Sequence, residues 1–418
     1  MQNVKNKNPL IWLGLVSFSS SLGLLLLFHN QSPLVADART YIDIAKNLFE
    51  NGEFYLNGAP NVRRPPLYPL YLAINFAFVG ENIFLIQLSQ IIFNICVVLL
   101  VYKLAGIFFT RKIAFYAAFS LAIFPPFAML PYHLLSEGLA CLLFISGIVI
   151  LYRAFQSGSL LLFTLSGAIM GFFALTRPVG LLIFVPIILS LTFVHYPQIA
   201  YKQSLAFILP FICVIGSWTA RNYVHTGKII PITIGADIEF WNGTYVPGHG
   251  EMEHPLTVAK KKKLFEEFDP DRPYYEFFSP FRAHAFNNLR QDPFGCLYLI
   301  PRKIVRLFIG SYAFIYNMPM SFSALLNGTQ FVPWKIALLV FKILMVLVSI
   351  VLTFMSFVGM WFVAKRDRRA VFIIAIFIYW VIIHLPFSPI QRFSIPLLPL
   401  MVLFSVGFLS RLYEERTA

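Results

Sequence analysis

Two acidic residues and several arginines stand out because they lie outside the long hydrophobic segments or at their ends. The acidic residues are Asp37 and Glu137, and the leading arginines are Arg64, Arg302 and Arg392. A carboxylate can act as a general base. A guanidinium group binds phosphate oxygens through a bidentate fork. These residue types predict chemistry on a phosphate-containing compound that is held at a membrane surface.

The composition indicates that these charges are carried by a membrane protein. Of the 418 residues, 58% are hydrophobic and only 12% are charged. A membrane-spanning helix needs about 20 mostly apolar residues, and many such runs occur. The runs are continuous rather than alternating, which favours helices over a barrel. The sequence therefore predicts an all-α polytopic membrane protein.

The positions of the basic residues predict the orientation in the membrane. Short cytoplasmic loops are enriched in Lys and Arg, and one side holds Arg111, Lys112, Arg153, Lys202, Lys365, Arg366, Arg368 and Arg369. That side is expected to be the cytoplasm, with both termini there, in an inner or plasma membrane. Much of the net charge of +14 then serves orientation, whereas the remainder lies on the other side and needs a different explanation. No nucleic acid partner is expected. The ten expected spans are 9–28, 82–109, 113–130, 137–155, 159–175, 179–195, 203–220, 334–363, 370–386 and 394–411.

Two long segments are expected on the non-cytoplasmic side. The first, residues 29–81, contains the apolar stretch Leu67–Val79, which is too short to span and is expected to lie in the interface. The second, residues 221–333, includes a helical pattern over Cys296–Tyr312. We therefore divide the chain into an N-terminal catalytic module (1–220), a large external loop (221–333) and the C-terminal spans (334–418).

Further polar residues on the same predicted side are secondary candidates for the site. They are Arg39, Tyr41, Arg63, Arg177, Arg221, Lys303 and Arg306. The four cysteines show neither a disulfide framework nor a metal-type spacing. We expect no cofactor, and a divalent metal is not predicted.

Several short motifs, taken in order, resemble the GT-C membrane glycosyltransferases. The similar family comprises the dolichyl-phosphate-mannose protein mannosyltransferase-like and aminoarabinose transferase-like enzymes. The motifs are Asp37-Ala-Arg-Thr-Tyr41, Arg63-Arg-Pro-Pro-Leu-Tyr-Pro69, Leu135-Ser-Glu-Gly138, Leu175-Thr-Arg-Pro-Val-Gly180, Trp218-Thr-Ala-Arg-Asn-Tyr223 and Arg392-Phe-Ser-Ile-Pro396. The resemblance implies a GT-C helical bundle, with interfacial helices in the first external loop and a large external loop before the last three spans. It also implies a polyprenyl-phosphate sugar donor.

The resemblance assigns roles to the polar residues. Asp37 matches the acidic residue of the first external loop, which acts as base or positions the acceptor, and Glu137 matches a later acidic residue. Arg64 keeps a phosphate-binding charge. Arg63 stands where aminoarabinose-type members carry glutamate, which argues against that sugar.

The sequence thus leads to a hypothesis of sugar transfer to a hydroxyl of a lipid, glycan or protein on the non-cytoplasmic face. Asp37 acts as base in an inverting single displacement, Glu137 orients the acceptor, and Arg64, Arg302 and Arg392 hold the phosphate. One alternative is a transporter or flippase, which predicts charges near the bilayer midplane. A ligase of lipid-linked glycans would share the external site. A non-catalytic scaffold with the same fold is a third alternative.

Overall fold

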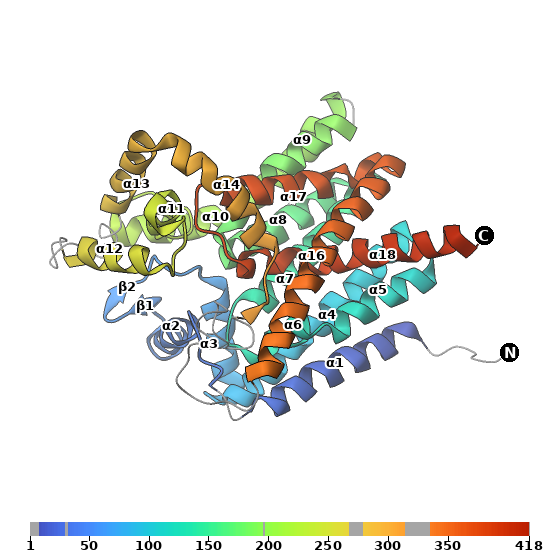
Figure 1. Cartoon of the computed structure of the whole chain (residues 1–418), viewed down its shortest axis with the longest axis horizontal. Helices are drawn as coiled ribbons and strands as arrows, with labels where there is room; N and C mark the ends of the chain where they lie inside the picture. The colour runs from blue at the N-terminus through green and yellow to red at the C-terminus, as the bar shows by residue number, and fades with distance from the viewer. Residues whose placement is uncertain (1–7, 30–31, 195–196, 267–278, 314–334, 418) are drawn as a thin grey trace.

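The computed structural model describes residues 8–29, 32–194, 197–266, 279–313 and 335–417, and in them the chain is almost entirely helical (Figure 1). The α-helices are α1 (Pro9–Leu27), α2 (Ala38–Asn51), α3 (Leu67–Val79), α4 (Ile83–Phe108), α5 (Arg111–Ile123), α6 (Pro125–Ala128), α7 (Glu137–Ser157), α8 (Leu160–Thr176), α9 (Phe184–Val194), α10 (Pro197–Thr226), α11 (Ala236–Thr244), α12 (Pro255–Glu266), α13 (Ser279–Gln291), α14 (Pro293–Phe308), α16 (Lys335–Arg366), α17 (Val371–His384) and α18 (Leu398–Thr417). Short 3-10 helices are η1 (Leu130–Tyr132), η2 (Pro178–Leu182), η3 (Val246–Gly248), η5 (Arg368–Ala370) and η6 (Gln391–Leu397). The strands β1 (Tyr55–Leu56) and β2 (Ala59–Pro60) form one antiparallel hairpin.

The expected multi-pass, all-α architecture is confirmed in its broad form. Among the described residues, six helices are long and apolar enough to cross a membrane, and a bent pair would make a seventh. The six are α1, α4 and α7, most of α10 and of α16, and the stretch Gln391–Ser410. Leu160–Thr176 and Pro178–Phe193 are apolar but shorter. The expected count of ten spans therefore stays a prediction.

Proline shapes one of the expected spans. The run predicted at 113–130 is bent by 61° between Arg111–Ile123 and Pro125–Tyr132. Pro125 and Pro126 follow one another at the bend. Proline lacks a backbone N–H and clashes with the preceding turn, so a helix kinks or ends there. The apolar stretch Leu67–Val79, in contrast, is a single helix with the predicted bounds.

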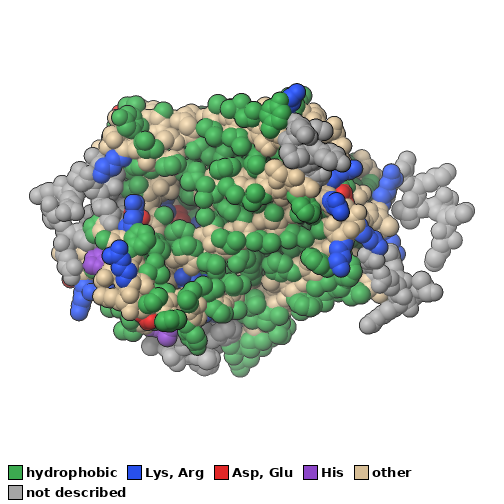
Figure 2. All heavy atoms as spheres, turned by 90° about the horizontal axis from the view of Figure 1, so that it is seen from above, with side chains coloured by type: hydrophobic (Ala, Val, Ile, Leu, Met, Phe, Trp, Pro, Cys, Tyr) green, Lys and Arg blue, Asp and Glu red, His purple; other side chains and the backbone are tan. Residues whose placement is uncertain are grey.

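Small residues let the central helices pack closely. A Cβ atom added to Gly167 of α8 would lie 2.1 Å from the backbone oxygen of Phe207 in α10. Because only glycine leaves that space open, the two backbones can touch. Apolar side chains cover the middle of the molecule, and basic side chains gather at its two ends (Figure 2). This is the surface expected of a helical bundle in a bilayer.

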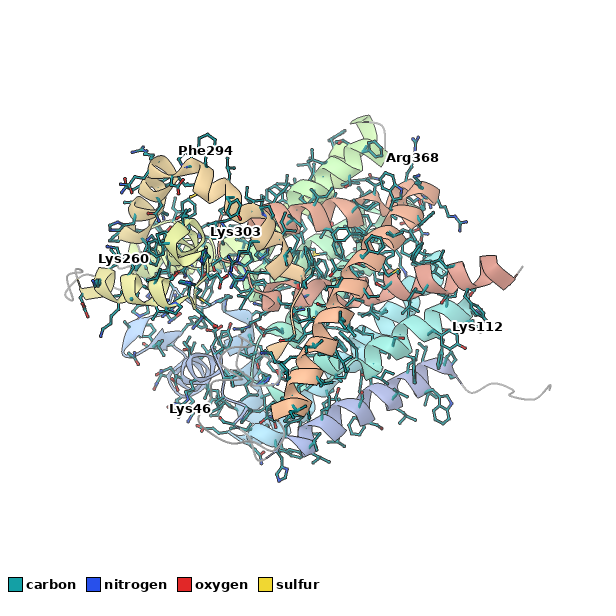
Figure 3. All side chains as sticks on the ribbon, viewed as in Figure 1. Lys46, Lys112, Lys260, Phe294, Lys303 and Arg368 are labelled. Carbon is teal, nitrogen blue, oxygen red and sulfur yellow. The ribbon has the colours of Figure 1, made fainter. Side chains whose placement is uncertain are left out.

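The two ends of the molecule differ in what they carry. Helix α1 begins and α18 ends at the same end (Figure 1). Lys112 and Arg368 also lie there, whereas Lys46 and Lys260 lie at the opposite end (Figure 3). That opposite end is built from α2, the hairpin and the helices α11, α12 and α13 (Figure 1). Parts of the predicted external loop, residues 267–278 and 314–333, lie outside the described residues.

Candidate functional site: a chain of alternating ion pairs

Asp37 immediately precedes helix α2 but does not cap it. Its side chain makes no hydrogen bond to the first turn of the helix. Its two oxygens lie instead 2.7 Å from Nη2 of Arg64 and 3.2 Å from Nη1 of Arg392. The carboxylate is 27% exposed. Helix capping alone therefore does not account for this residue, and a partly accessible carboxylate stands between two cations.

Arg64 is positioned by a tight turn before α3. The buried Asn61 side chain accepts hydrogen bonds from the backbone N–H groups of Arg63 and Arg64, at 3.0 and 2.9 Å. Such Asx turns fix the direction of the following residues. The Arg64 guanidinium lies over the Tyr41 ring, with its carbon 5.7 Å from the ring centre. Its buried Nε has no hydrogen-bond partner in the described part of the chain.

Glu137 is the first residue of α7 and is almost completely buried, at 1% exposure. Its Oε1 accepts a hydrogen bond from Nε of Arg392 and lies 2.9 Å from Nη2 of Arg177. Its Oε2 has no hydrogen-bond partner among the residues that the structure describes. The N-terminus of a helix favours a carboxylate. A buried charge also needs partners of opposite sign, and the two guanidinium groups supply them.

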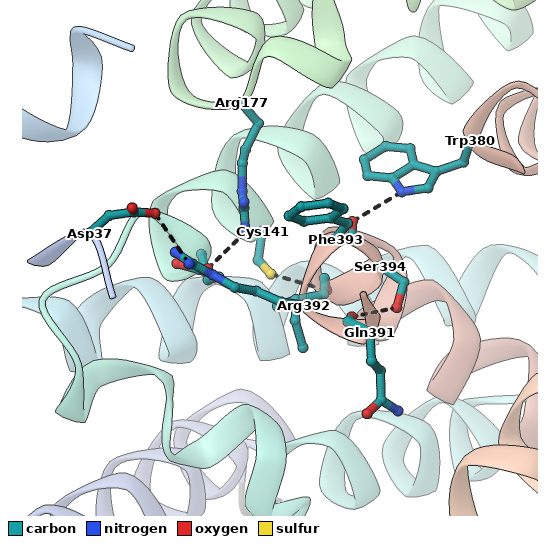
Figure 4. A network of polar contacts seen from close by, with 10 residues as sticks. Asp37, Cys141, Arg177, Trp380, Gln391, Arg392, Phe393 and Ser394 are labelled. Atoms are coloured by element: carbon teal, nitrogen blue, oxygen red, sulfur yellow. Dashed lines mark hydrogen bonds and ion pairs between the residues drawn. The ribbon is translucent and has the colours of Figure 1, made fainter. Parts of the chain in front are cut away.

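Arg392 joins the two carboxylates (Figure 4). It belongs to η6, whose neighbouring residue Gln391 is anchored to the segment after α14. The Gln391 side chain accepts from the backbone N–H of Tyr312 at 2.9 Å and donates to the carbonyls of Phe308 and Gly310 at 3.3 Å. The external segment therefore fixes the backbone that carries Arg392.

These contacts form one chain of alternating charges. In order it runs Arg64, Asp37, Arg392, Glu137, Arg177. Three guanidinium groups face two carboxylates, so one positive charge is in excess. The chain brings together four of the five leading sequence candidates, and Arg177, a secondary one, completes it. A cluster with excess positive charge and unsatisfied polar atoms is suited to bind an anion.

Arg302, the fifth leading candidate, contacts a different carboxylate. Glu251 lies 3.0 Å from Nη2 of Arg302 and 3.5 Å from Nη1 of Arg306. Lys303, between them in sequence, donates to the carbonyl of Leu385 at 2.7 Å. Burial lowers the pKa of Lys303 to about 8. The phosphate-binding role of Arg302 stays a prediction.

The other secondary candidates differ in their surroundings. Arg221 donates to the carbonyls of Asn61 and Phe54, at 2.9 and 2.8 Å, and lies over the Trp218 ring at 4.8 Å. It ties α10 to the first external segment. Tyr41 is buried under Arg64, and this burial raises the pKa of its phenol. Arg39 and Arg63 are exposed.

Two residues of the site region were not among the sequence candidates. Asn61 holds the backbone of Arg63 and Arg64, and an Asn two residues before a double arginine is a recognisable turn signal. Glu239 lies in α11, and its electrostatic partners include Asp37 and Arg63. Its place next to Trp241-Asn242-Gly243 gave no chemical signal. Within the described ranges, no group of three or more His, Cys, Asp or Glu residues is placed to hold a metal ion.

Comparison with known proteins adds one finding. Residues 63–218 match the model of the family described as Dolichyl-phosphate-mannose-protein mannosyltransferase. The matched stretch contains Arg64, Glu137 and Arg177, while Asp37 and Arg392 lie outside it. No curated protein matches the chain. The resemblance to the GT-C mannosyltransferase-like family is thereby confirmed.

Proposed function

We propose that this membrane glycosyltransferase of the GT-C type transfers a sugar from a polyprenyl-phosphate donor to a hydroxyl acceptor. The family match supports the glycosyltransferase class. The donor, the direction of displacement and the base are our proposal. The observation that carries it is the contact of Asp37 with both Arg64 and Arg392. It places a carboxylate directly beside the cations that would bind a phosphate.

The chemistry needs one base and fixed positive charge. Asp37 takes the proton of the acceptor hydroxyl, and the acceptor oxygen forms a bond to the anomeric carbon. The bond from that carbon to the phosphate oxygen breaks, and the polyprenyl phosphate leaves with the electron pair as an anion. Attack opposite the leaving group inverts the anomeric centre. The leaving phosphate needs no proton, because preorganised cations stabilise the charge that develops on it.

Arg64 and Arg392 are the residues that we assign to the phosphate. Arginine has five N–H donors, and Arg64 keeps its Nε unsatisfied in the described chain while it pairs with Asp37. A phosphate at Arg64 competes with Asp37 for the guanidinium. Donor binding would thereby weaken the hold on Asp37 and free its oxygens for the acceptor hydroxyl. Because Arg302 pairs with Glu251, we do not assign it to the phosphate.

An apolar groove supports a prenyl tail. The groove has a volume of about 780 Å³ and lies between η2 with the start of α9 and the helix α10. Residues that line it include Leu182, Phe184, Phe211, Ile212, Ile215 and Tyr223. It begins at η2, which directly follows Arg177 in the chain. An apolar groove on the element that follows Arg177 in the chain suits a ligand with a phosphate head and a hydrocarbon tail.

The proposed side of the membrane is the non-cytoplasmic one. Lys112 and Arg368 lie at the end of the molecule where α1 begins and α18 ends (Figure 3). Short loops rich in Lys and Arg stay in the cytoplasm. The helices of the large external loop and α2 lie at the other end, which supports an active site that faces away from the cytoplasm.

The test is a transfer assay in membranes that contain the protein and a labelled polyprenyl-phosphate mannose. Replacing Asp37 by Asn keeps its shape and removes the base, and general base catalysis contributes about 10²–10⁴-fold. We expect transfer to fall by that factor. Asp43→Asn is the matched control, since Asp43 is an exposed residue of the same α2 helix, and it should transfer as the wild type does. Full activity of Asp37→Asn would remove Asp37 from the mechanism.

A further inference from the structure

A second polar cluster lies where the large external loop meets the first one. The backbone N–H of Ile234 donates to the carbonyl of Val62 at 2.9 Å. Val62 immediately precedes Arg63 and Arg64, and Ile234 immediately precedes the turn at Gly235 that opens α11. Helix α11 therefore begins beside the segment that carries the double arginine.

Glu239, in α11, is within electrostatic range of charged residues of the site. Burial raises the pKa of its carboxyl, and the charge of Asp37 raises it further, whereas Lys261 and Arg63 lower it. The hydrogen bond between Ile234 and Val62, which brings the start of α11 to the first external segment, agrees with these influences. Its Oε2 also accepts a hydrogen bond from Nδ2 of Asn242 at 3.4 Å.

Asn242 has an unsatisfied polar atom. The residue is 0% exposed, yet its Oδ1 has no hydrogen-bond partner in the described part of the protein. A buried carbonyl oxygen without a partner is rare in folded proteins and calls for an explanation. Its own Nδ2 already points to Glu239, so the two side chains form one polar unit.

Lys261, in helix α12, acts electrostatically on the Glu239 carboxyl. Thr257, Lys261 and Leu264 are spaced by four and three residues and therefore share one face of the helix. Thr257 and Leu264 are buried on that face, and Lys261 is half-buried. The neighbouring Lys260 and Lys262 are exposed. Of the four consecutive lysines at 260–263, Lys261 is thus the one on the buried face of the helix.

We propose that Glu239 and Lys261 bind the hydroxyl groups of the sugar on the lipid donor, and that the buried Asn242 positions Glu239. A carboxylate accepts hydrogen bonds and an ammonium donates them, and a sugar hydroxyl does both. The sugar is bonded directly to the donor phosphate, and we assign that phosphate to Arg64, the neighbour of Arg63. The inference rests on the proposed function. It assigns sugar recognition to α11 and α12 of the large loop.

The second acid of α11 shows what a purely structural role looks like. Asp237 lies 2.9 and 3.0 Å from Nε and Nη2 of Arg282, in a bidentate pair. Its carboxylate is therefore paired with an arginine of the neighbouring helix α13. Glu239 has no such guanidinium fork among the contacts that the structure gives it. Asp237→Asn is therefore a matched control for Glu239→Gln.

Binding of two probes to the purified protein in nanodiscs tests the inference. One probe is polyprenyl-phosphate mannose, and the other is the same polyprenyl phosphate without a sugar. Glu239→Gln should weaken binding of the first probe at least tenfold and change binding of the second by less than twofold. Lys261→Met should do the same, with exposed Lys262→Met as its control. Asp237→Asn should bind both probes as the wild type does. A thermal unfolding transition measured for each variant checks that it is folded. If Glu239→Gln does not fold, the binding of the two probes by Lys261→Met tests the inference.

Three results would overturn the inference. Equal affinities of the wild type, Glu239→Gln and Lys261→Met for the mannose probe would show that the cluster does not touch the sugar. Equal weakening of both probes would show a structural or phosphate effect. Weaker use of an acceptor, with unchanged binding of both probes, would assign the cluster to the acceptor. If the wild type binds neither probe, the proposed function itself fails.

Discussion

Replacing Arg392 by Lys is the sharpest perturbation of the ion-pair chain. The wild-type guanidinium donates to Glu137 through Nε and to Asp37 through Nη1. Lysine keeps the positive charge but concentrates its donors at one nitrogen, so it does not reproduce the planar fork. We expect the ammonium to stay with the buried Glu137 and to leave Asp37 with Arg64 alone.

The expected magnitude follows from the lost contact. A hydrogen bond to a charged group contributes about 1.5–3 kcal/mol. At 1.36 kcal/mol for each factor of ten, its loss lowers the transfer rate by roughly 10- to 150-fold. The assay is initial-rate transfer from polyprenyl-phosphate mannose in nanodiscs, with the concentration of folded protein measured independently.

A matched control separates this effect from a general one. Arg290 is an exposed arginine of α13, and Arg290→Lys should keep wild-type activity. A folded Arg392→Lys variant that transfers within threefold of the wild type would refute the reasoning. Asp37 would then not depend on the bridge for its position.

The remaining predictions concern packing and titration. Arg221→Ala should lower the melting temperature, because it removes both hydrogen bonds that tie α10 to the first external segment, including the one to Asn61; wild-type stability would contradict this role. Gly167→Ala should also destabilise the protein, by about 1–3 kcal/mol, because its Cβ would meet the backbone of α10, whereas Gly106→Ala meets no atom within 4 Å and should be tolerated. Lys303→Met tests the titration of a buried lysine. The pKa of Lys303 in the folded protein, about 8, lies below the ordinary value of 10.5. Between pH 8 and 10.5 the unfolded chain therefore binds more protons than the folded protein, so the stability of the wild type rises with pH in this range. The melting temperature of Lys303→Met should lack the part of this rise that comes from Lys303. The same pH dependence of the melting temperature in both proteins would contradict the prediction.

The overall class of the fold could be predicted because hydrophobicity alone determines it. Continuous apolar runs leave only helices in a bilayer, and α3 has the bounds that its apolar stretch predicted. The finer geometry was harder to foresee. Helix bends and short helices such as η2 and η6 depend on tertiary packing and on proline, and a hydropathy pattern does not report either.

The candidate site could be predicted as a set of residues better than as a set of contacts. Their positions relative to the spans predict Asp37, Glu137, Arg64 and Arg392 as site residues, and the structure joins them in one chain. The partner of Arg302 was not foreseen, because Glu251 lies about fifty residues away in a loop without a motif.

The positions of Arg177 and Glu239 show a second limit of prediction from the sequence. Arg177 completes the chain because the turn before η2 brings it to Glu137. Glu239 comes near the site because the residue Ile234, just before α11, is hydrogen-bonded to Val62 in the segment that carries Arg63. Both placements are long-range contacts, and a single sequence carries no signal for them.

A structure of the protein with a polyprenyl phosphate bound, determined by cryo-electron microscopy, would test the central claim most directly. We predict phosphate oxygens at about 3 Å from Arg64 and Arg392, with the prenyl chain in the groove beside α10 and with Asp37 next to the phosphate. A phosphate held by Arg302 and Arg306, with the ion pairs of Asp37 undisturbed, would contradict it.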